Sequence, residues 1–250
     1  MPTLYIIATP IGNLEDITLR ALRVLKEVDM ILCEDTRMTQ RLLKHYGVVN
    51  KQLATYNAQQ SGIKIEKIIQ WLEEGKNLAL VSDAGTPTIS DPGVLLVSQI
   101  REHFKVGPLG SPRSDLGVSI VPVPGPSAVI AALSASGLPS SDFLFLGFLP
   151  HKKGRETLFK EIALSKRTTV FYESPHRIFK TLESLKKHLD EKRRIVLARE
   201  LTKIYEEMVT GTTQEILQYF EKNKDKIKGE FVVMVDPVKG RTRSQVRAEE

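Results

Sequence analysis

The chain has little cysteine and no long hydrophobic run. Cys33 is the single cysteine among 250 residues, so an intramolecular disulfide framework and a cysteine-rich zinc site are both excluded, and a reducing compartment is favoured. No apolar stretch approaches the roughly 18 to 20 residues that are needed to span a bilayer. The first nine residues also lack the charged and apolar regions of a secretion signal. We therefore expect a soluble, cytoplasmic protein with no membrane partner.

Several cofactor signatures are absent as well. No G-x-G-x-x-G follows the first strand-like run, and no G-x-x-x-x-G-K-S/T occurs anywhere, which disfavours a nicotinamide dinucleotide and a P-loop nucleotide. No cluster of His, Cys and carboxylate residues has the spacing of a metal site. We expect no metal cofactor.

Charge of one sign is in only slight excess. The chain contains 36 Lys and Arg against 30 Asp and Glu, which gives a formal charge of +6. Part of this excess lies in residues 222–228 and in the Arg-rich tail. An excess of this size is as compatible with an ordinary solvated surface as with a nucleic-acid partner. Composition alone leaves both interpretations open.

What the chain does contain is a regular alternation of short apolar runs and helical stripes. Strands are predicted over residues 3–9, 30–33, 78–81 and 119–123, with helices between them, and such steps indicate a largely parallel sheet covered on both faces. The pattern restarts after Ser140, with strands over 143–148, 168–172, 195–198 and 231–235. We predict two α/β domains, 1–124 and 125–240, followed by a basic tail over 241–250. The Gly-, Pro- and Ser-rich segment 107–117 is predicted to be an exposed connecting loop.

Three loops rich in glycine and proline follow predicted strands. They are 9–13 (TPIGN), 82–93 (SDAGTPTISDPG) and 122–127 (PVPGPS). In an open parallel sheet, ligands bind outside the carboxyl ends of the strands. Glycine lets a ligand approach the backbone closely, and proline restricts the course of the loop. One such loop is typical of an ordinary turn, whereas three at strand ends predict a site for a small polar cofactor.

Seven motifs then occur in a recognisable order. They are ATPIGNLEDIT (8–18), CEDTR (33–37), SDAGTPTISDPG (82–93), PVPGPSA (122–128), GFLP (147–150), YESPHR (172–177) and ARELTK (198–203). With these motifs the chain resembles, over about residues 3–237, the ribose 2′-O-methyltransferases of small-subunit ribosomal RNA within the tetrapyrrole methylase superfamily. Two features differ from that family: segment 107–117 looks longer, and the chain ends at Glu250 without a small helical extension, which puts part of the RNA contact in doubt.

The resemblance implies a class III methyltransferase, with two α/β domains and S-adenosylmethionine in a cleft between them. It also implies homodimerisation and, as target, the ribose 2′-hydroxyl of a cytidine in the decoding region of 16S ribosomal RNA. The loop from Ala84 to Ile89 would hold the amino acid part of the cofactor, and the backbone near Gly211 and Phe231 would frame the adenosine. The full set of implied cofactor-binding residues is Pro10, Gly12, Asp83, Ala84, Gly85, Thr86, Pro87, Ile89, Gly125, Ser127, Ala128, Gly211 and Phe231.

Methyl transfer to a hydroxyl needs positioning and a group that accepts the proton. The candidates for proton transfer at strand ends are Glu34 and Asp35, Glu173 and His176, and Glu200 with Lys203, and the sequence does not choose among them. Arg37 belongs to the catalytic candidates, although Glu34, Asp35 and Arg37 equally suit a helix start with a salt-bridging arginine. Glu200 and Lys203 also suit a surface ion pair. His176 and Arg177 are predicted to contact RNA phosphates rather than only to begin a helix.

Two alternatives stand beside this hypothesis. The first is C-methylation of a tetrapyrrole precursor, because a fold alone does not distinguish the substrates. Tetrapyrrole enzymes carry a glycine-rich G-x-G-P-G-D pattern in the first loop, where this chain has Pro10-Ile11-Gly12-Asn13. The second is a non-catalytic RNA-binding or ribosome-assembly factor, and the intact glycine and proline loops argue against it.

Overall fold

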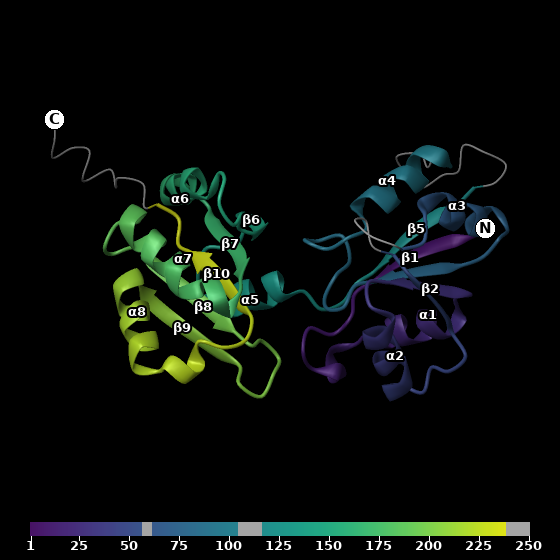
Figure 1. Cartoon of the computed structure of the whole chain (residues 1–250), viewed down its shortest axis with the longest axis horizontal. Coiled ribbons are helices and arrows are strands. Elements are labelled where there is room, and N and C mark those ends of the chain that lie inside the picture. The colour runs from purple at the N-terminus through teal and green to yellow at the C-terminus, as the bar shows by residue number, and fades with distance from the viewer. Residues whose placement is uncertain (57–61, 105–116, 239–250) are drawn as a thin grey trace. The chain divides into compact units, whose positions relative to one another are not determined.

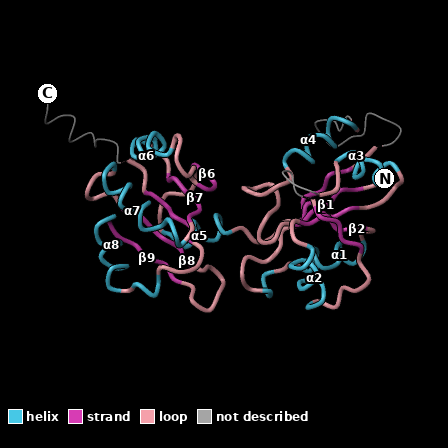
Figure 2. The backbone as a smooth tube through the Cα atoms, in the orientation of Figure 1, coloured by secondary structure: helices cyan, strands magenta, loops and turns pink. Residues whose placement is uncertain are grey.

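The chain folds into two compact units, Met1–Ser127 and Ala128–Glu250. The computed structural model describes residues 1–56, 62–104 and 117–238, and both units consist of a sheet with helices packed against it (Figures 1 and 2). The predicted fold class, two α/β domains, is confirmed. Residues 107–116 of the predicted loop and the predicted basic tail over 241–250 lie outside the described residues.

The first unit contains a five-stranded parallel sheet. Its strands are β1 (Thr3–Ile7), β2 (Met30–Cys33), β3 (Gln52–Thr55), β4 (Leu78–Val81) and β5 (Ser119–Val123), and its helices are α1 (Leu19–Glu27), α2 (Thr36–His45), α3 (Ile65–Glu73) and α4 (Val94–His103), with a short 3-10 helix at Leu14–Asp16. The strand order is β3-β2-β4-β1-β5, and every pairing is parallel, as predicted. The sequence analysis did not identify β3, a short edge strand that is only partly buried.

Both faces of this sheet are covered, because adjacent strand residues point to opposite faces. Ile31 packs with Ala21 and Leu25 of α1 on one face. Leu32 packs with Ile68 and the tryptophan of α3 on the other. The carboxyl ends of the parallel strands are therefore left as the open edge of the unit, and the glycine- and proline-rich loops lie there.

The second unit contains a mixed sheet. Its helices are α5 (Ala128–Ser136), α6 (Arg155–Leu164), α7 (Pro175–His188) and α8 (Thr213–Lys222), with a 3-10 helix at Lys224–Lys226, and its strands are β6 (Phe143–Phe148), β7 (Thr168–Glu173), β8 (Arg194–Arg199), β9 (Glu207–Thr212) and β10 (Phe231–Val235). The order is β6-β7-β10-β8-β9.

A repeat of the parallel pattern in the second unit was therefore the wrong expectation. Only β6 and β7 pair in parallel, and the other three pairings are antiparallel. The reason is that β8 turns directly into β9, a strand that the sequence analysis missed, and that β10 inserts between β7 and β8. Helix α5 packs on one face with Val170 and Val196, whereas α6, α7 and α8 cover the other face around Phe159 and Phe231.

One edge of the second sheet gathers loops from distant parts of the chain. Phe231, at the start of β10, lies opposite Glu173 at the end of β7 and opposite Arg199 at the end of β8. The loops after β6, β7 and β8 and the segment before β10 consequently leave the sheet at the same edge. No helix in the described parts of the chain is long and apolar enough to cross a membrane.

Candidate functional site

The loops after β1 and β4 in the first unit are joined directly. The backbone N–H of Thr9 donates to the carbonyl of Gly85 at 2.8 Å, and the N–H of Gly85 donates to the carbonyl of Thr9 at 3.0 Å. The hydroxyl of Thr9 also donates to the carbonyl of Ser82 at 3.1 Å. Two loops that are 76 residues apart in the sequence are thus held as one piece.

Glycine is required at position 85 by the backbone. Gly85 has a φ of +79°, and an added Cβ would lie 3.4 Å from Cγ2 of Ile11. A positive φ is disfavoured for residues with a side chain, most strongly for β-branched ones. This glycine therefore keeps the joined loops close together.

The loop after β5 is attached to the same assembly. The Thr86 hydroxyl donates to the carbonyl of Pro126 at 3.1 Å. Gly125 packs so closely on Ala8 that an added Cβ would lie 2.9 Å from the Ala8 Cβ. The predicted cofactor-binding residues from Pro10 to Ser127 thus lie on three interlinked loops, whereas Ala128 begins α5 in the second unit.

The loop after β4 has strained backbone. Thr88 and Ser90 adopt positive φ values of 75° and 66°, which cost about 1–3 kcal/mol each and persist only where the surroundings impose them. Within the described chain, the backbone N–H groups of Thr88 and Ser90 have no hydrogen-bond partner. These N–H groups can donate hydrogen bonds to an anionic group of a ligand. The sequence analysis missed this feature, because strain at a threonine has no local sequence signal.

Acidic residues gather where β2 and β4 end. Asp83 accepts a hydrogen bond from the backbone N–H of Asp35 at 3.2 Å. Burial, with smaller contributions from the charges of Asp91 and Asp83, raises the pKa of Glu34 to about 7. Burial likewise raises the pKa values of Asp83 and Asp91. Glu34 can consequently exchange a proton near neutral pH.

Asp35 and Arg37 have a different role from Glu34. The Asp35 carboxylate caps α2 by accepting from the N–H of Arg37 at 2.8 Å. It also pairs with the Arg37 guanidinium at 2.7 Å. Hydrogen bonds from Arg37 lower the pKa of Asp35 to about 2. Asp35 is therefore a poor proton acceptor. Capping of α2 and the ion pair with each other account for the positions of Asp35 and Arg37.

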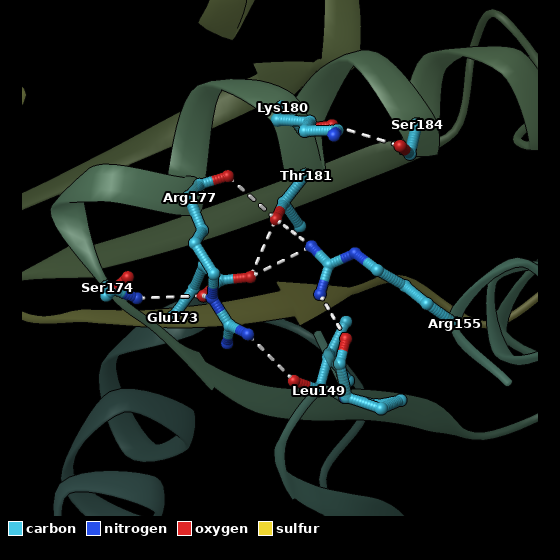
Figure 3. A network of polar contacts seen from close by, with 9 residues as sticks. Leu149, Arg155, Glu173, Ser174, Arg177, Lys180, Thr181 and Ser184 are labelled. Atoms are coloured by element: carbon cyan, nitrogen blue, oxygen red, sulfur yellow. Dashed lines mark hydrogen bonds and ion pairs between the residues drawn. The ribbon is translucent and has the colours of Figure 1, made fainter. Parts of the chain in front are cut away.

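A buried carboxylate organises the second unit. Glu173, at the end of β7, is 2% exposed. It pairs with Arg155 at 3.2 Å and with Arg177 at 2.7 Å, and it accepts from the hydroxyl of Thr181 at 2.6 Å and from the N–H of Ser174 at 2.9 Å. Figure 3 shows these groups converging on the carboxylate. Glu173 is thus fully engaged within the protein.

The two arginines extend this network to the loop after β6. Arg177 donates to the carbonyl of Leu149 at 3.0 Å, and Arg155 donates to the carbonyl of Pro150 at 3.0 Å (Figure 3). Arg177 is therefore committed to internal contacts, while its neighbour His176 is exposed. Contact of both residues with RNA stays a prediction, and the structure favours His176 for it. Sequence reasoning missed Arg155, because its partner Glu173 is 18 residues away.

Glu200 and Lys203 form a local ion pair at the end of β8. The Lys203 Nζ donates to Glu200 at 2.9 Å and to Glu230 at 2.9 Å. Burial opposes the effect, but these carboxylates raise the pKa of Lys203, and Lys203 helps to lower the pKa of Glu200. Neither residue is poised to exchange a proton near neutral pH.

Gly211 and Phe231 are not brought together. Gly211 lies opposite Ile195, near the start of β8, whereas Phe231 lies opposite Arg199, at its end. Four residues of strand separate the two levels by about 13 Å. The Phe231 side chain is also buried in the core. That the backbone near both residues frames one adenosine stays a prediction.

No group of three or more His, Cys, Asp or Glu residues is placed to hold a metal ion within residues 1–56, 62–104 and 117–238. The charges of Glu34, Asp83 and Asp91 interact, but burial is the largest cause of the raised pKa of each carboxyl group.

Comparison with known proteins identifies relatives along nearly the whole chain. Residues 3–217 match the family of tetrapyrrole (corrin/porphyrin) methylases. The chain is 47% identical over 234 residues to ribosomal RNA small subunit methyltransferase I of Escherichia coli O157:H7, covering 93% of this chain and 77% of that protein. It is 44% identical over 224 residues to the protein of the same name from Thermotoga maritima, covering 90% of this chain and 94% of the other.

Solved structures agree on the fold. The methyltransferase CobJ matches with a TM-score of 0.65 and 18% identity over 97% of both chains. The uroporphyrin-III-C-methyltransferase from Thermus thermophilus matches with a TM-score of 0.61 and 18% identity over 94% of both chains. From the family match and the two close relatives, the chain belongs to the tetrapyrrole (corrin/porphyrin) methylases and, among them, to the group of ribosomal RNA small subunit methyltransferases I.

Proposed function

We propose that the chain is an S-adenosylmethionine-dependent methyltransferase that modifies the ribose 2′-hydroxyl of a cytidine in the decoding region of small-subunit ribosomal RNA. The observation that carries the proposal is the joining of three strand-end loops through Thr9, Gly85 and Thr86. The relatives of this chain are named ribosomal RNA small subunit methyltransferase I. We infer that it acts in the cytoplasm, where ribosomal subunits are found, and as a homodimer.

The residues present suit the chemistry of S-adenosylmethionine. Its amino acid part carries a carboxylate and an ammonium group. The unpartnered N–H groups of Thr88 and Ser90 are suited to the carboxylate, and the carboxylate of Asp83 is suited to the ammonium group. Gly85 and Gly125 let these loops pack closely against neighbouring segments, which keeps the loop backbone in one position. When bound, S-adenosylmethionine supplies a methyl group made electrophilic by a sulfonium.

Glu34 is the proton acceptor that we propose. A ribose hydroxyl becomes a good nucleophile only as its proton leaves, so the accepting group should have a pKa near the working pH. Glu34 meets this condition, because burial and the neighbouring carboxylates raise its pKa to about 7. Asp35, with a pKa of about 2, is too weak a base, and Glu173 is enclosed by its own partners.

To test the proposal, the purified protein is incubated with small ribosomal subunits and with S-adenosylmethionine labelled in the methyl group. We expect label on one nucleotide of the small-subunit RNA, and nuclease digestion should recover it on the ribose. A parallel reaction with a porphyrin precursor should stay unlabelled. Label on a base, or on the porphyrin precursor alone, would refute the proposal. If calorimetry detects binding of S-adenosylmethionine but no substrate becomes labelled, the non-catalytic alternative is favoured.

A further inference from the structure

The loop after β6 carries free positive charge on a fixed base. His151, Lys152 and Lys153 are exposed, and within the described chain their side chains have no hydrogen bond or ion pair. The carbonyls just before them accept from Arg155 and Arg177, whose guanidinium groups are held by buried Glu173 (Figure 3). The loop backbone is therefore held by these two arginines, while its lysine side chains face solvent.

His176 adds an exposed imidazole at the same edge of the sheet. It lies in the first turn of α7, which follows β7, and β7 runs parallel to β6. Its side chain is exposed and has no partner among the described residues. Arg177, next in the chain, is held by Glu173. The exposed groups available to an outside anion are thus the ammonium groups of Lys152 and Lys153 and the imidazoles of His151 and His176.

The loop between β8 and β9 presents apolar side chains at this edge. Ile204 is 94% exposed and Tyr205 is 71% exposed. The backbone beneath them is held in place, because the guanidinium of buried Arg199 donates to the carbonyl of Tyr205 at 3.1 Å and to that of Lys228 at 2.9 Å. Tyrosine is enriched at contact surfaces, because its ring is apolar and its hydroxyl is polar.

The loop between β8 and β9 also has strained backbone, which its contacts hold in place. Glu200 and Thr202 adopt positive φ values of 50° and 67°. Lys203 ties Glu200 to Glu230 in the segment before β10. Non-glycine residues in this region persist where the surroundings over-determine them, often at ligand-binding sites. Contacts within the second unit therefore hold the backbone of the loop that carries Tyr205.

We propose that this edge of the second unit binds a single-stranded segment of the substrate RNA. Lys152, Lys153, His151 and His176 contact phosphates, and Tyr205 stacks on an unpaired base. From β6 to β8 the edge spans three strand spacings, about 14 Å, which suits a short run of nucleotides. Unpaired cations beside an exposed aromatic are the combination that recognises single-stranded nucleic acid. This inference rests on the proposed function and names the surface that receives its substrate.

The charge part is tested with Lys152→Gln/Lys153→Gln, measured for binding to naked small-subunit ribosomal RNA over a salt series. Removing two phosphate contacts should reduce the slope of log affinity against log salt by about 1.4 to 1.8. The matched control is Lys186→Gln/Lys187→Gln, the same change on exposed residues of the last turn of α7, about 15 Å along the helix from His176. The control should retain the slope of the unmodified protein. Equal slopes in all three proteins would overturn the charge assignment.

The stacking part is tested with Tyr205→Ala and Tyr205→Phe. Loss of one stacked base should weaken RNA binding roughly ten- to hundred-fold without changing the salt slope, and phenylalanine should retain the affinity. The affinity for S-adenosylmethionine should be unchanged in both. Unchanged RNA affinity in Tyr205→Ala would overturn the inference. A change in the mass of this variant, measured by light scattering, would also overturn it, because the edge would then be a contact between two copies of the chain.

The two proposals fail in distinguishable ways. If the unmodified protein methylates ribosomal RNA while Lys152→Gln/Lys153→Gln and Tyr205→Ala do so at the same rate and affinity, only the surface is wrong. If the unmodified protein neither binds nor methylates the RNA, the proposed function itself is refuted.

Discussion

Gly85 and Glu34 make opposite contributions to the first unit. Gly85 relieves backbone strain at the junction of the loops after β1 and β4. Glu34 adds a cost, because its carboxylate is partly withdrawn from water beside two other acids. Residues that keep an unfavourable environment are frequently those that carry function. Each of the two supplies a prediction at the scale of a single side chain.

Gly85→Val should weaken binding of S-adenosylmethionine by ten-fold or more, because a β-branched residue at this φ strains the loop and its side chain meets Ile11. The matched control is Gly47→Val, which also places valine at a positive φ, +65°, but in open space. Both variants should lose about 1–2 kcal/mol of unfolding free energy. Calorimetry with the cofactor separates them, and equal affinities would exclude the loop from the cofactor site.

Glu34→Gln should lower the methylation rate and alter the pH dependence of stability. The pKa of Glu34 is about 7 in the folded state against 4.5 for the unperturbed group, so the folded state holds this proton more tightly. Its ionisation destabilises the fold progressively as pH rises from about 4.5 to about 7. At pH 8, Glu34→Gln should therefore be more stable than the unmodified protein, by roughly 1–2 kcal/mol after allowance for solvent exposure. At pH 4 the two should unfold alike in urea.

Asp91→Asn tests the contribution of a neighbouring charge to that pKa, which is smaller than the contribution of burial. The charge of Asp91 raises the pKa of Glu34, so its removal should move the midpoint of the rate profile to lower pH. The quantity to measure is the single-turnover methylation rate between pH 5 and pH 9. A midpoint that stays in place would show that the charge of Asp91 does not act on the group that titrates.

Elements in the second unit are joined by charge as well as by apolar packing. Glu173 at the end of β7 connects the first turns of α6 and α7 through Arg155 and Arg177. Because the carboxylate is buried, removal of one partner leaves an incompletely compensated charge. This network also holds the loop between β6 and α6 through its two carbonyl contacts.

Arg177→Ala should lower the unfolding free energy by about 2–4 kcal/mol, because buried Glu173 loses one of its two arginines. His176→Ala, one residue earlier and exposed, should change stability by less than about 0.5 kcal/mol. Urea unfolding of the two variants provides the comparison. An Arg177→Ala protein of unaltered stability, with impaired RNA binding, would instead restore Arg177 as a direct RNA contact.

At the scale of the whole molecule, catalysis is expected to proceed without a metal. Within the described residues no ligand cluster is available to a metal ion, and the chain has a single, buried cysteine. Protein treated with a chelator and then separated from it should bind S-adenosylmethionine with unchanged affinity and should methylate small subunits at the original rate. Loss of cofactor binding, reversed by one divalent ion, would contradict this prediction.

Elements with a local signal could be predicted from the amino-acid sequence. Helical stripes and apolar runs predicted the parallel sheet of the first unit, and glycine and proline placed the three loops at its open edge, because periodicity and turn chemistry act over a few residues. The motifs that resemble a family added its fold and its chemistry.

Which of those residues meet depends on how distant segments of the chain pack together. Arg155 pairs with Glu173 across 18 residues, Thr9 meets Gly85 across 76, and β10 enters between β7 and β8. The structure also separated Glu34, with its raised pKa, from Asp35, which caps a helix, although the two are neighbours in the chain. Burial and charge pairing depend on the register and packing of distant segments, and no pattern within a short window contains that information.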